Sequence, residues 1–272
     1  MNLKKLAFTA LSMVSLTTLA ACGNNEKSIK VGVIGEDYDE WEHVSEKVKD
    51  EGINLEVVAF TDYSQPNRAL ADGDIDLNAF QHHIFLENFN EEFGADLEPI
   101  ANTIIEPLGI YSDEVTDVSE IGDGDQISIP NDVTNGGRAL ILLQSAGLIE
   151  VDPEVGITPT VDDITDNPLN LEITELDAAQ TARSLGDVTA AIVNADMAVN
   201  AGFDPNQDAI FLEPIDENSE PYINLIAARA DDDREEFDVI IEAYQADDTI
   251  EVLQERTKGS TIPVWKEDFQ NN

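Results

Sequence analysis

Apolar and polar positions follow two periods along this chain, one typical of buried strands and one of amphipathic helices. Short apolar runs bounded by glycine, proline or acidic residues predict strands. Apolar residues at spacings of three and four predict helices that bury one face. The predicted strands cover residues 29–34, 55–60, 126–130, 171–176, 188–193 and 222–228, and an extended stretch covers 100–111. The predicted helices cover residues 38–50, 66–71, 138–148 and 232–246.

The order of these elements predicts the fold class. Strand and helix alternate in a βαβα rhythm, which is typical of parallel strands covered by helices. The strands before about residue 110 and those after about residue 125 form two clusters. We therefore expect an α/β protein with two lobes and a ligand cleft between them. The first lobe would consist of 29–110 together with the returning segment 226–272, and the second of 111–225.

The first apolar run of the chain has a different character. Lys4 and Lys5 precede an uncharged stretch over 6–19, and Ala20-Ala21-Cys22 follows. A basic start, an apolar centre and a small-residue cleavage site are typical of a secretory signal peptide. The run is shorter than the roughly 20 apolar residues of a membrane-spanning helix, so a retained transmembrane anchor is the weaker alternative. The end of the run resembles a bacterial lipobox, in which the cysteine is lipidated and becomes the first mature residue.

The lipobox resemblance implies a location for the folded protein. We expect removal of 1–21 as a lipoprotein signal peptide, which leaves 22–28 as a lipidated tether. Acyl chains such as palmitate on Cys22 would hold the protein to the cell membrane on its extracytoplasmic face. Two chains anchor stably where a single chain is marginal. Cys22 is the only cysteine of the chain, so an intramolecular disulfide is impossible.

Composition limits the partners of this protein. The 272 residues contain 57 Asp and Glu against 14 Lys and Arg, a formal net charge of −43. Nucleic acid and anionic lipid are poor partners for such a surface. The hydrophobic fraction of 42% is ample for a core, so the chain is not an acidic disordered tail. The acids are spread along the chain, and we infer a saline or otherwise unusual external medium; the alternative is an ordinary acidic surface protein.

Three polar stretches are hard to explain by folding alone. They lie at 62–67 with 73–82, at 129–140, and at 193–194 with 221–225. The first reads Tyr-x-x-Pro-Asn and then Gly-Asp-Ile-Asp-x-Asn-x-Phe-Gln-His. The second contains Pro-Asn-Asp-x-x-Asn-x-Gly-Arg-Ala-Leu, and the third ends in Pro-Tyr-x-Asn-Leu.

These motifs and the lipobox, in this order and over nearly the whole mature chain, resemble the methionine-binding lipoproteins of ABC importers, the NlpA lipoprotein family. The resemblance implies a two-lobed, periplasmic-binding-protein-like α/β fold without enzymatic activity or cofactor. It implies a monomer that captures methionine and delivers it to an ABC transporter permease and its ATPase. L-Methionine is the first expectation, and D-methionine or a methionine dipeptide is an alternative.

The resemblance also implies which residues bind the ligand. Tyr63 and Phe80 would flank the thioether, where sulfur beside aromatic rings gains about 0.3–1.5 kcal/mol. Arg138 would take the ligand carboxylate. The full implied set is Tyr63, Phe80, His82, Asn135, Arg138, Asn194 and Asn224, with Asn194 and Asn224 at the amino and carboxylate groups.

The chemistry of an amino-acid zwitterion points to the same arginine. A carboxylate removed from water favours a planar, permanently charged, bidentate donor. Asn135-Gly136-Gly137 predicts a loop that opens a helix just before Arg138, and free N–H groups at a helix start favour an anion. Asparagine both donates and accepts, which suits either end of a zwitterion.

Structural roles remain open for each of these residues. Arg138 could pair with a protein carboxylate, and Tyr63 and Phe80 could be core aromatics. His82 and its neighbour His83 could be solvated helix residues. The asparagines 135, 194 and 224 could serve a turn or satisfy backbone groups at strand ends.

Two positions depart from the family pattern. Many members carry an aromatic residue where this chain has Glu106, and the loop after the first strand is Gly35-Glu36-Asp37-Tyr38 instead of a Gly-Pro-His-like segment. A ligand contact at either position would change specificity.

Three rival functions are weaker. A zinc or manganese lipoprotein would need His and carboxylate ligands, but the chain has only His43, His82 and His83 and no His-rich loop. An extracytoplasmic enzyme is not supported, because Gly-x-Ser-x-Gly and His-Glu-x-x-His motifs are absent from the sequence. A structural or adhesive lipoprotein would not explain why the chain has an arginine and several asparagines suited to binding an amino-acid zwitterion. We expect no metal site.

The acid excess predicts that salt stabilises the mature domain. Screening shortens from about 10 Å at 0.1 M salt to about 3 Å at 1 M, so self-repulsion falls. We expect the melting temperature, followed by circular dichroism, to rise over this range in potassium chloride. A domain that melts highest in low salt would contradict the saline interpretation.

Overall fold

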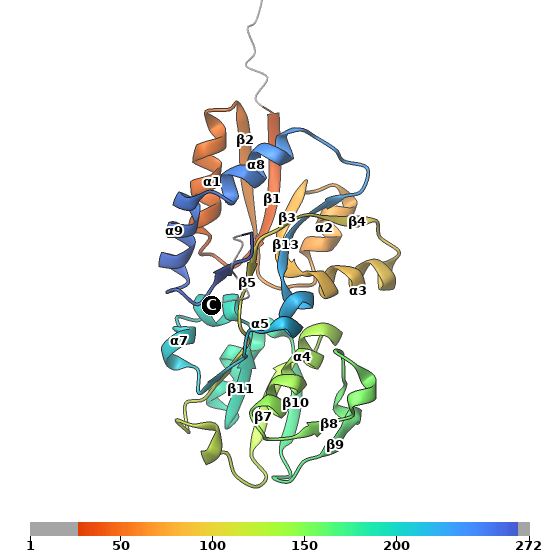
Figure 1. The fold of residues 1–272 in the computed structure, drawn as a ribbon, viewed down its shortest axis with the longest axis vertical. Coiled ribbons are helices and arrows are strands. Elements are labelled where there is room, and N and C mark those ends of the chain that lie inside the picture. The colour runs from red at the N-terminus through yellow and green to blue at the C-terminus, as the bar shows by residue number, and fades with distance from the viewer. Residues whose placement is uncertain (1–26, 266–272) are drawn as a thin grey trace, which may run out of the picture.

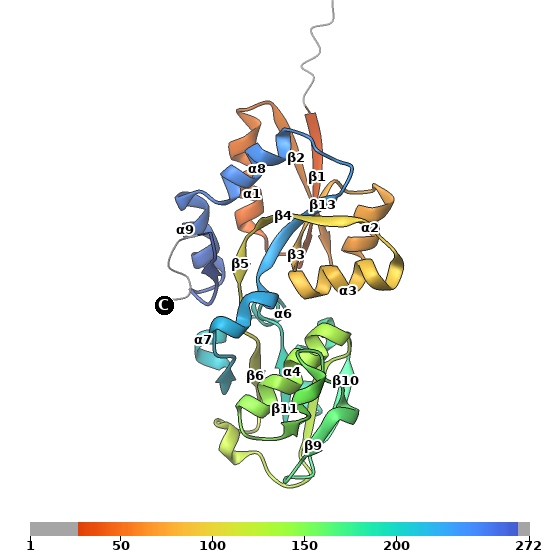
Figure 2. The ribbon, with the colours of Figure 1, turned by 45° about the vertical axis from the view of Figure 1, so that its right-hand side comes forward.

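The computed structural model describes residues 27–265 of the 272-residue chain. The predicted signal peptide, Cys22 and most of the tether lie outside the described residues. The described part forms two lobes, one above the other along the long axis of the molecule (Figure 1, Figure 2). Each lobe is built around one five-stranded sheet, as the βαβα rhythm predicts. None of the helices within 27–265 is both long and apolar enough to cross a membrane.

The sheet of the first lobe has the order β2-β1-β3-β13-β4. Its strands are β1 (Lys27–Ile34), β2 (Ile53–Phe60), β3 (Leu77–His82), β4 (Leu97–Asn102) and β13 (Asn224–Arg229). β1 pairs in parallel with β2 and β3, and β13 runs antiparallel between β3 and β4. The chain therefore returns to this lobe after it has built the second one.

Helices cover both faces of this first sheet (Figure 1). They are α1 (Asp39–Lys49), α2 (Pro66–Asp72), α3 (His83–Phe93), α8 (Glu236–Tyr244) and α9 (Asp247–Arg256). On one face, Trp41 of α1 and Phe237 of α8 pack on Val31 of β1. On the other face, Leu70 of α2 and Leu86 of α3 belong to a second buried cluster.

The sheet of the second lobe has the order β10-β7-β11-β6-β12. Its strands are β6 (Gly109–Tyr111), β7 (Gln126–Pro130), β10 (Glu172–Leu176), β11 (Ala190–Val193) and β12 (Phe211–Leu212). The helices that follow or cover them are α4 (Val133–Ser145), α5 (Ala178–Thr181), α6 (Ala195–Asn200) and α7 (Pro205–Asp208). β7 is parallel to β10 and β11, whereas β6 is antiparallel to β11 and β12.

Short elements complete the two lobes. β5 (Ile104–Ile105) pairs with β14 (Ile262–Pro263), and β8 (Glu150–Val151) pairs with β9 (Ile164–Asp166). The short 3₁₀ helices are η1 (Val118–Glu120), η2 (Pro153–Val155), η3 (Val161–Asp163), η4 (Ala182–Gly186) and η5 (Glu217–Tyr222).

The chain crosses between the lobes through β5 and again between η5 and β13 (Figure 1, Figure 2). These crossings suggest lobe boundaries near residues 108 and 223, close to the expected 110 and 225, and the division stays a proposal. The carboxyl ends of parallel strands are where α/β sheets place ligands. Here β3 ends at His82 in one lobe, and β7 and β11 end at Pro130 and Val193 in the other. An apolar cluster joins Ile34 of the first sheet to residues of the second.

One local prediction is wrong. The sequence 135–137 is not a loop that opens a helix, because α4 already begins at Val133. Asp132 caps this helix by accepting a hydrogen bond from the backbone N–H of Asn135 at 2.9 Å. The glycines permit close packing within the first turns instead. A Cβ at Gly137 would lie 2.7 Å from the Thr158 Cα, so only glycine fits there without a shift.

Other elements differ in extent from the prediction. The strands predicted at 29–34, 55–60 and 126–130 are confirmed as β1, β2 and β7. The helix predicted over 232–246 is shorter and is followed directly by α9. β3 and α3 were not predicted, because polar residues interrupt the apolar period where this strand and helix meet.

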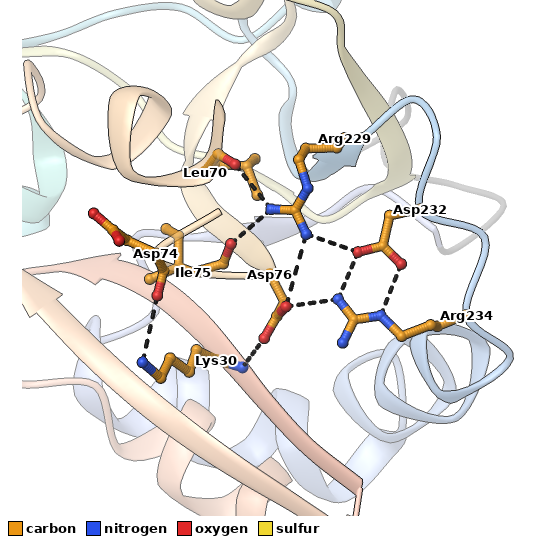
Figure 3. A network of polar contacts seen from close by, with 8 residues as sticks. All are labelled: Lys30, Leu70, Asp74, Ile75, Asp76, Arg229, Asp232 and Arg234. Atoms are coloured by element: carbon orange, nitrogen blue, oxygen red, sulfur yellow. Dashed lines mark hydrogen bonds and ion pairs between the residues drawn. The ribbon is translucent and has the colours of Figure 1, made fainter. Parts of the chain in front are cut away.

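A network of charged groups fastens the returning segment to the first lobe (Figure 3). Arg229, at the end of β13, donates from Nη1 to the carbonyls of Leu70 and Ile75, both at 2.8 Å. Its Nη2 donates to Asp232 at 2.9 Å. Arg234 donates to Asp232 and to Asp76, and the hydrogen bond from Arg234 lowers the pKa of the Asp232 carboxyl.

Removing Arg229 tests this network. Arg229→Ala removes the donor to the carbonyls of Leu70 and Ile75, while Arg234 still donates to Asp232, so we expect a loss of about 1–3 kcal/mol in the free energy of unfolding. Urea unfolding of the mature domain measures it. Arg183 is exposed and forms no ion pair among the described residues, so Arg183→Ala should stay within about 0.5 kcal/mol of wild type. Equal effects of the two substitutions would contradict the structural role.

Candidate functional site

A cavity of about 410 Å³ lies where the strand ends of the two lobes meet. All seven residues that the resemblance implied line it: Tyr63, Phe80, His82, Asn135, Arg138, Asn194 and Asn224. The sequence reasoning did not assign the other lining residues, which are Gln81, Phe85, Glu106, Leu108, Ala195 and Asp196. Whether the seven residues bind ligand stays a prediction.

Three aromatic rings form the apolar wall of this cavity. Tyr63, Phe80 and Phe85 lie with ring centroids 5.7–6.1 Å apart, in tilted and edge-to-face arrangements. Such geometries are favourable between aromatic rings. A side chain that fits among them must be apolar and polarisable, which suits a thioether.

Three amide side chains around Phe80 hold β3 against α2. Asn67 of α2 exchanges two hydrogen bonds of 2.6 Å with Gln81 of β3. Asn78 donates to Asn67 at 2.8 Å and accepts from Gln81 at 2.9 Å. All three amides are buried and satisfied. Much of the polar pattern that drew attention in the sequence therefore fixes β3 against α2, and only Phe80, Gln81 and His82 of this strand line the cavity.

His82 is buried and neutral. It ends β3 and caps α3, where its Nδ1 accepts a hydrogen bond from the backbone N–H of Phe85 at 3.2 Å. The ring proton must then be on Nε2, which donates to Asn135 Oδ1 at 3.3 Å. Burial, and after it the positive charge of Arg138, lowers the pKa of His82 to about 3. His82 is thus not a solvated helix residue.

Asn135 links His82 to Asn194 across the cleft. Asn194 Nδ2 donates to Asn135 Oδ1 at 2.8 Å, so this oxygen accepts from both lobes. The Asn135 Nδ2 donates to the Asp132 carboxylate. This arrangement fixes the orientation of the Asn194 amide. Its Oδ1 is buried and has no hydrogen-bond partner among the described residues.

Arg138 lies inside α4 and is engaged by a protein carboxylate. Its Nε donates to Glu213 Oε1 at 2.8 Å, and its Nη2 bonds both Glu213 Oε2 and the Glu106 carbonyl. The guanidinium lies over the Tyr222 ring, 4.4 Å from its centroid. Arg138 thus forms the ion pair with a protein carboxylate that was the alternative to a ligand contact. These bonds leave Nη1 as the nitrogen that neither Glu213 nor Glu106 engages.

Two further carboxylates line the cavity. Burial raises the pKa of Glu106, and the charge of Asp196 raises it further. Burial also raises the pKa of Asp196, against the hydrogen bond from Tyr63. Glu106, the departure from the family pattern, also borders an adjoining space of about 510 Å³ that the loop residues Asp37 and Tyr38 line.

The three histidines do not form a cluster. His83 contacts Asn102 at 2.7 Å and His43 contacts Asp248 at 3.1 Å, both away from the cavity. Within residues 27–265 no group of three or more His, Cys, Asp or Glu side chains is arranged to hold a metal ion.

Two lobes whose strand ends meet at a cavity with an aromatic wall, an arginine and buried amides define the class of extracytoplasmic substrate-binding proteins. The family model described as NlpA lipoprotein matches residues 29–265. The chain belongs to the NlpA lipoprotein family, as its motifs indicated.

Named relatives agree with this membership. The D-methionine-binding lipoprotein MetQ of Yersinia pestis is 40% identical over 97% of this chain and 100% of its own length. The solved substrate-binding protein of a methionine transporter from Streptococcus pneumoniae is 45% identical, with a TM-score of 0.83 over 88% of this chain and 96% of that one. A nutrient-binding protein from Burkholderia cenocepacia, solved bound to methionine, is 39% identical, with a TM-score of 0.83 over 87% and 99%.

The buried neutral His82 predicts a pH dependence of stability. The unfolded chain binds a proton near the ordinary pKa of 6.5, whereas folded His82 binds it only near pH 3. Acidification between these values therefore favours the unfolded state, by at most about 1.4 kcal/mol per pH unit. Urea unfolding of wild type and His82→Gln at pH 7, 6 and 5 should show a steeper loss in wild type. Parallel curves would mean that His82 is not buried as a neutral ring.

Proposed function

We propose that this protein is a lipid-anchored, extracytoplasmic receptor that captures methionine and delivers it to an ABC importer. The observation that carries the proposal is that one cavity has both an aromatic wall and a polar lining of Arg138, Asn135, Asn194 and Asn224. The names of the relatives point to the same ligand. The role is binding and not catalysis.

The aromatic wall would hold the thioether side chain. Sulfur between Tyr63 and Phe80 would gain about 0.3–1.5 kcal/mol per ring contact. Tyr63 is itself fixed, because its hydroxyl donates to Asp196. A polar side chain would lose its water in this wall without gaining partners, so the wall favours methionine over polar amino acids.

The ligand carboxylate would lie at Arg138. Glu213 holds the guanidinium through Nε and Nη2, so Nη1 remains to donate. Asn224 at the start of β13 lines the same cavity, and its amide has no hydrogen-bond partner among the described residues. An arginine anchored by a protein carboxylate is preorganised, which reduces the entropy lost on binding.

Ligand binding would be coupled to closure of the cleft. Tyr63 to Asp196 and His82 to Asn135 already connect the lobes directly. A ligand with its thioether on the first lobe and its carboxylate on the second adds contacts that exist only when the lobes are closed. Such differential contacts are what shifts a two-state equilibrium. The closed form would then dock on the permease and its ATPase.

Titration calorimetry tests the ligand and the arginine together. We expect L-methionine to bind the refolded, ligand-free mature domain, with Arg138→Ala losing about 2–5 kcal/mol because one partner of a buried charge pair is removed. Arg138→Lys is the matched control: it keeps a charge beside Glu213 but loses the planar fork. D-Methionine and methionine dipeptides are titrated in parallel, since the Yersinia pestis relative is named for the D form.

An unchanged affinity in a folded Arg138→Ala domain would remove the arginine from the site. Failure of wild type to bind any of these compounds, in low or molar salt, would overturn the proposed function.

Lipid anchoring has its own test. Cys22→Ala removes the acylated residue, so the full chain should leave the membrane fraction of the expressing cells, where wild type remains. Retention of the variant in that fraction would favour an uncleaved transmembrane anchor.

A further inference from the structure

We infer that Glu106, Asp196 and the Asn194 amide oxygen form a subsite that clamps the α-ammonium group of the ligand. This inference rests on the proposed function and adds to it the residues that recognise the amino end. It makes a free, positively charged amine a requirement for tight binding.

The three side chains line one cavity, and each leaves one oxygen unused. Asp196 Oδ1 accepts from the Tyr63 hydroxyl and from the Met197 N–H, so its Oδ2 is left. Glu106 Oε1 accepts from Thr261 at 2.9 Å, so its Oε2 is left. The Asn194 Oδ1 has no partner among the described residues, although the residue is only 8% exposed.

An unpartnered buried acceptor is costly, by about 1–3 kcal/mol, and so points to a missing donor. The Asn194 amide cannot flip to remove this cost. Its Nδ2 is fixed by donation to Asn135 Oδ1, which cannot donate back. The free oxygen therefore faces a donor that the protein chain does not supply.

The charge balance around the cavity points to a cation. Arg138 is paired with Glu213, and Arg256 is paired with Glu40. His82 is neutral. Neither Glu106 nor Asp196 forms an ion pair with a residue in 27–265, although the charge of Arg256, itself paired with Glu40, acts on the pKa of both carboxyls. Burial raises the pKa of each carboxyl, and the charge of Asp196 raises that of Glu106 further, so a cation placed between them would stabilise their charged forms.

An ammonium group fits these demands by number and by charge. It carries three N–H donors and one positive charge. The unused oxygens of Glu106, Asp196 and Asn194 are three acceptors for these donors. A hydroxyl group or a water molecule would satisfy the Asn194 oxygen but would leave the two carboxylates uncompensated. An aromatic residue at the position of Glu106, as the family pattern has it, could not supply this charge.

A comparison of two ligands on three proteins tests the subsite. The ligands are L-methionine and its desamino analogue methylthiobutanoate, which keeps the thioether and the carboxylate. The proteins are wild type, Glu106→Gln and the control Glu98→Gln, in which the acid lies exposed on β4 outside the cavity. Asp196→Asn is a second variant, because an amide oxygen can still accept from Tyr63.

Titration calorimetry should show at least about a tenfold loss of L-methionine affinity in Glu106→Gln, as expected for a buried charge contact. The desamino analogue should bind wild type weakly and should bind Glu106→Gln equally well or better, since a buried charge is removed. Glu98→Gln should match wild type for both ligands. A merely structural role of Glu106 would weaken both ligands alike.

Two outcomes would overturn the subsite while leaving the proposed function intact. One is L-methionine binding equally to wild type, Glu106→Gln and Asp196→Asn. The other is wild type binding the desamino analogue as tightly as L-methionine. Loss of both ligands from wild type would instead contradict the proposed function itself.

Discussion

The hydrogen-bonded chain from His82 through Asn135 to Asn194 is the constraint on which the rest of the site depends. It joins the end of a strand in the first lobe to the first turn of a helix and the end of a strand in the second. His82 donates to Asn135 through a proton on Nε2, while its unprotonated Nδ1 accepts from the backbone N–H of Phe85. Burial keeps the ring in that state. Because Asn135 Oδ1 then accepts from both sides, the Asn194 amide is oriented and its oxygen is left for the cavity.

Charge is used sparingly around this chain of amides. The protein has 14 Lys and Arg residues against 57 Asp and Glu residues, and several of its arginines form ion pairs or hydrogen bonds inside the fold. Arg138 and Arg256 hold buried carboxylates, and Arg229 ties β13 to α2. Removing one member of a buried pair is far more costly than losing an exposed one. The positive charge that the cavity still lacks is therefore best brought by the ligand.

The sequence predicted the fold well where the apolar period is regular. β1, β2 and β7 are apolar runs; β1 pairs in parallel with β2 across α1, and β7 pairs in parallel with β11 in the other sheet. The period failed at β3 and α3, because Asn78 and Gln81 are buried amides that satisfy one another. The pair Gly136-Gly137 was misread as a loop because close packing on Thr158, and not a turn, requires the glycine at 137.

The site was predictable as a set of residue types but not as a geometry. The motifs pointed to seven of the thirteen residues that line the cavity, because the motifs cover places where strands end and helices begin. The ion pair of Arg138 with Glu213 joins residues 75 positions apart, and no local sequence pattern predicts it. Asp196 was overlooked as one acid among many. Its signal was its position three residues after the end of β11, a fully buried strand, and for Glu106 it was the departure from an aromatic residue.

A crystal structure of the mature domain grown with L-methionine tests the account most directly. We predict the thioether beside Tyr63 and Phe80, the carboxylate on Arg138, and the amino nitrogen within hydrogen-bond distance of Glu106, Asp196 and Asn194. The His82–Asn135–Asn194 chain should be intact. A ligand bound in another cavity, or one whose carboxylate faces Glu106, would contradict it.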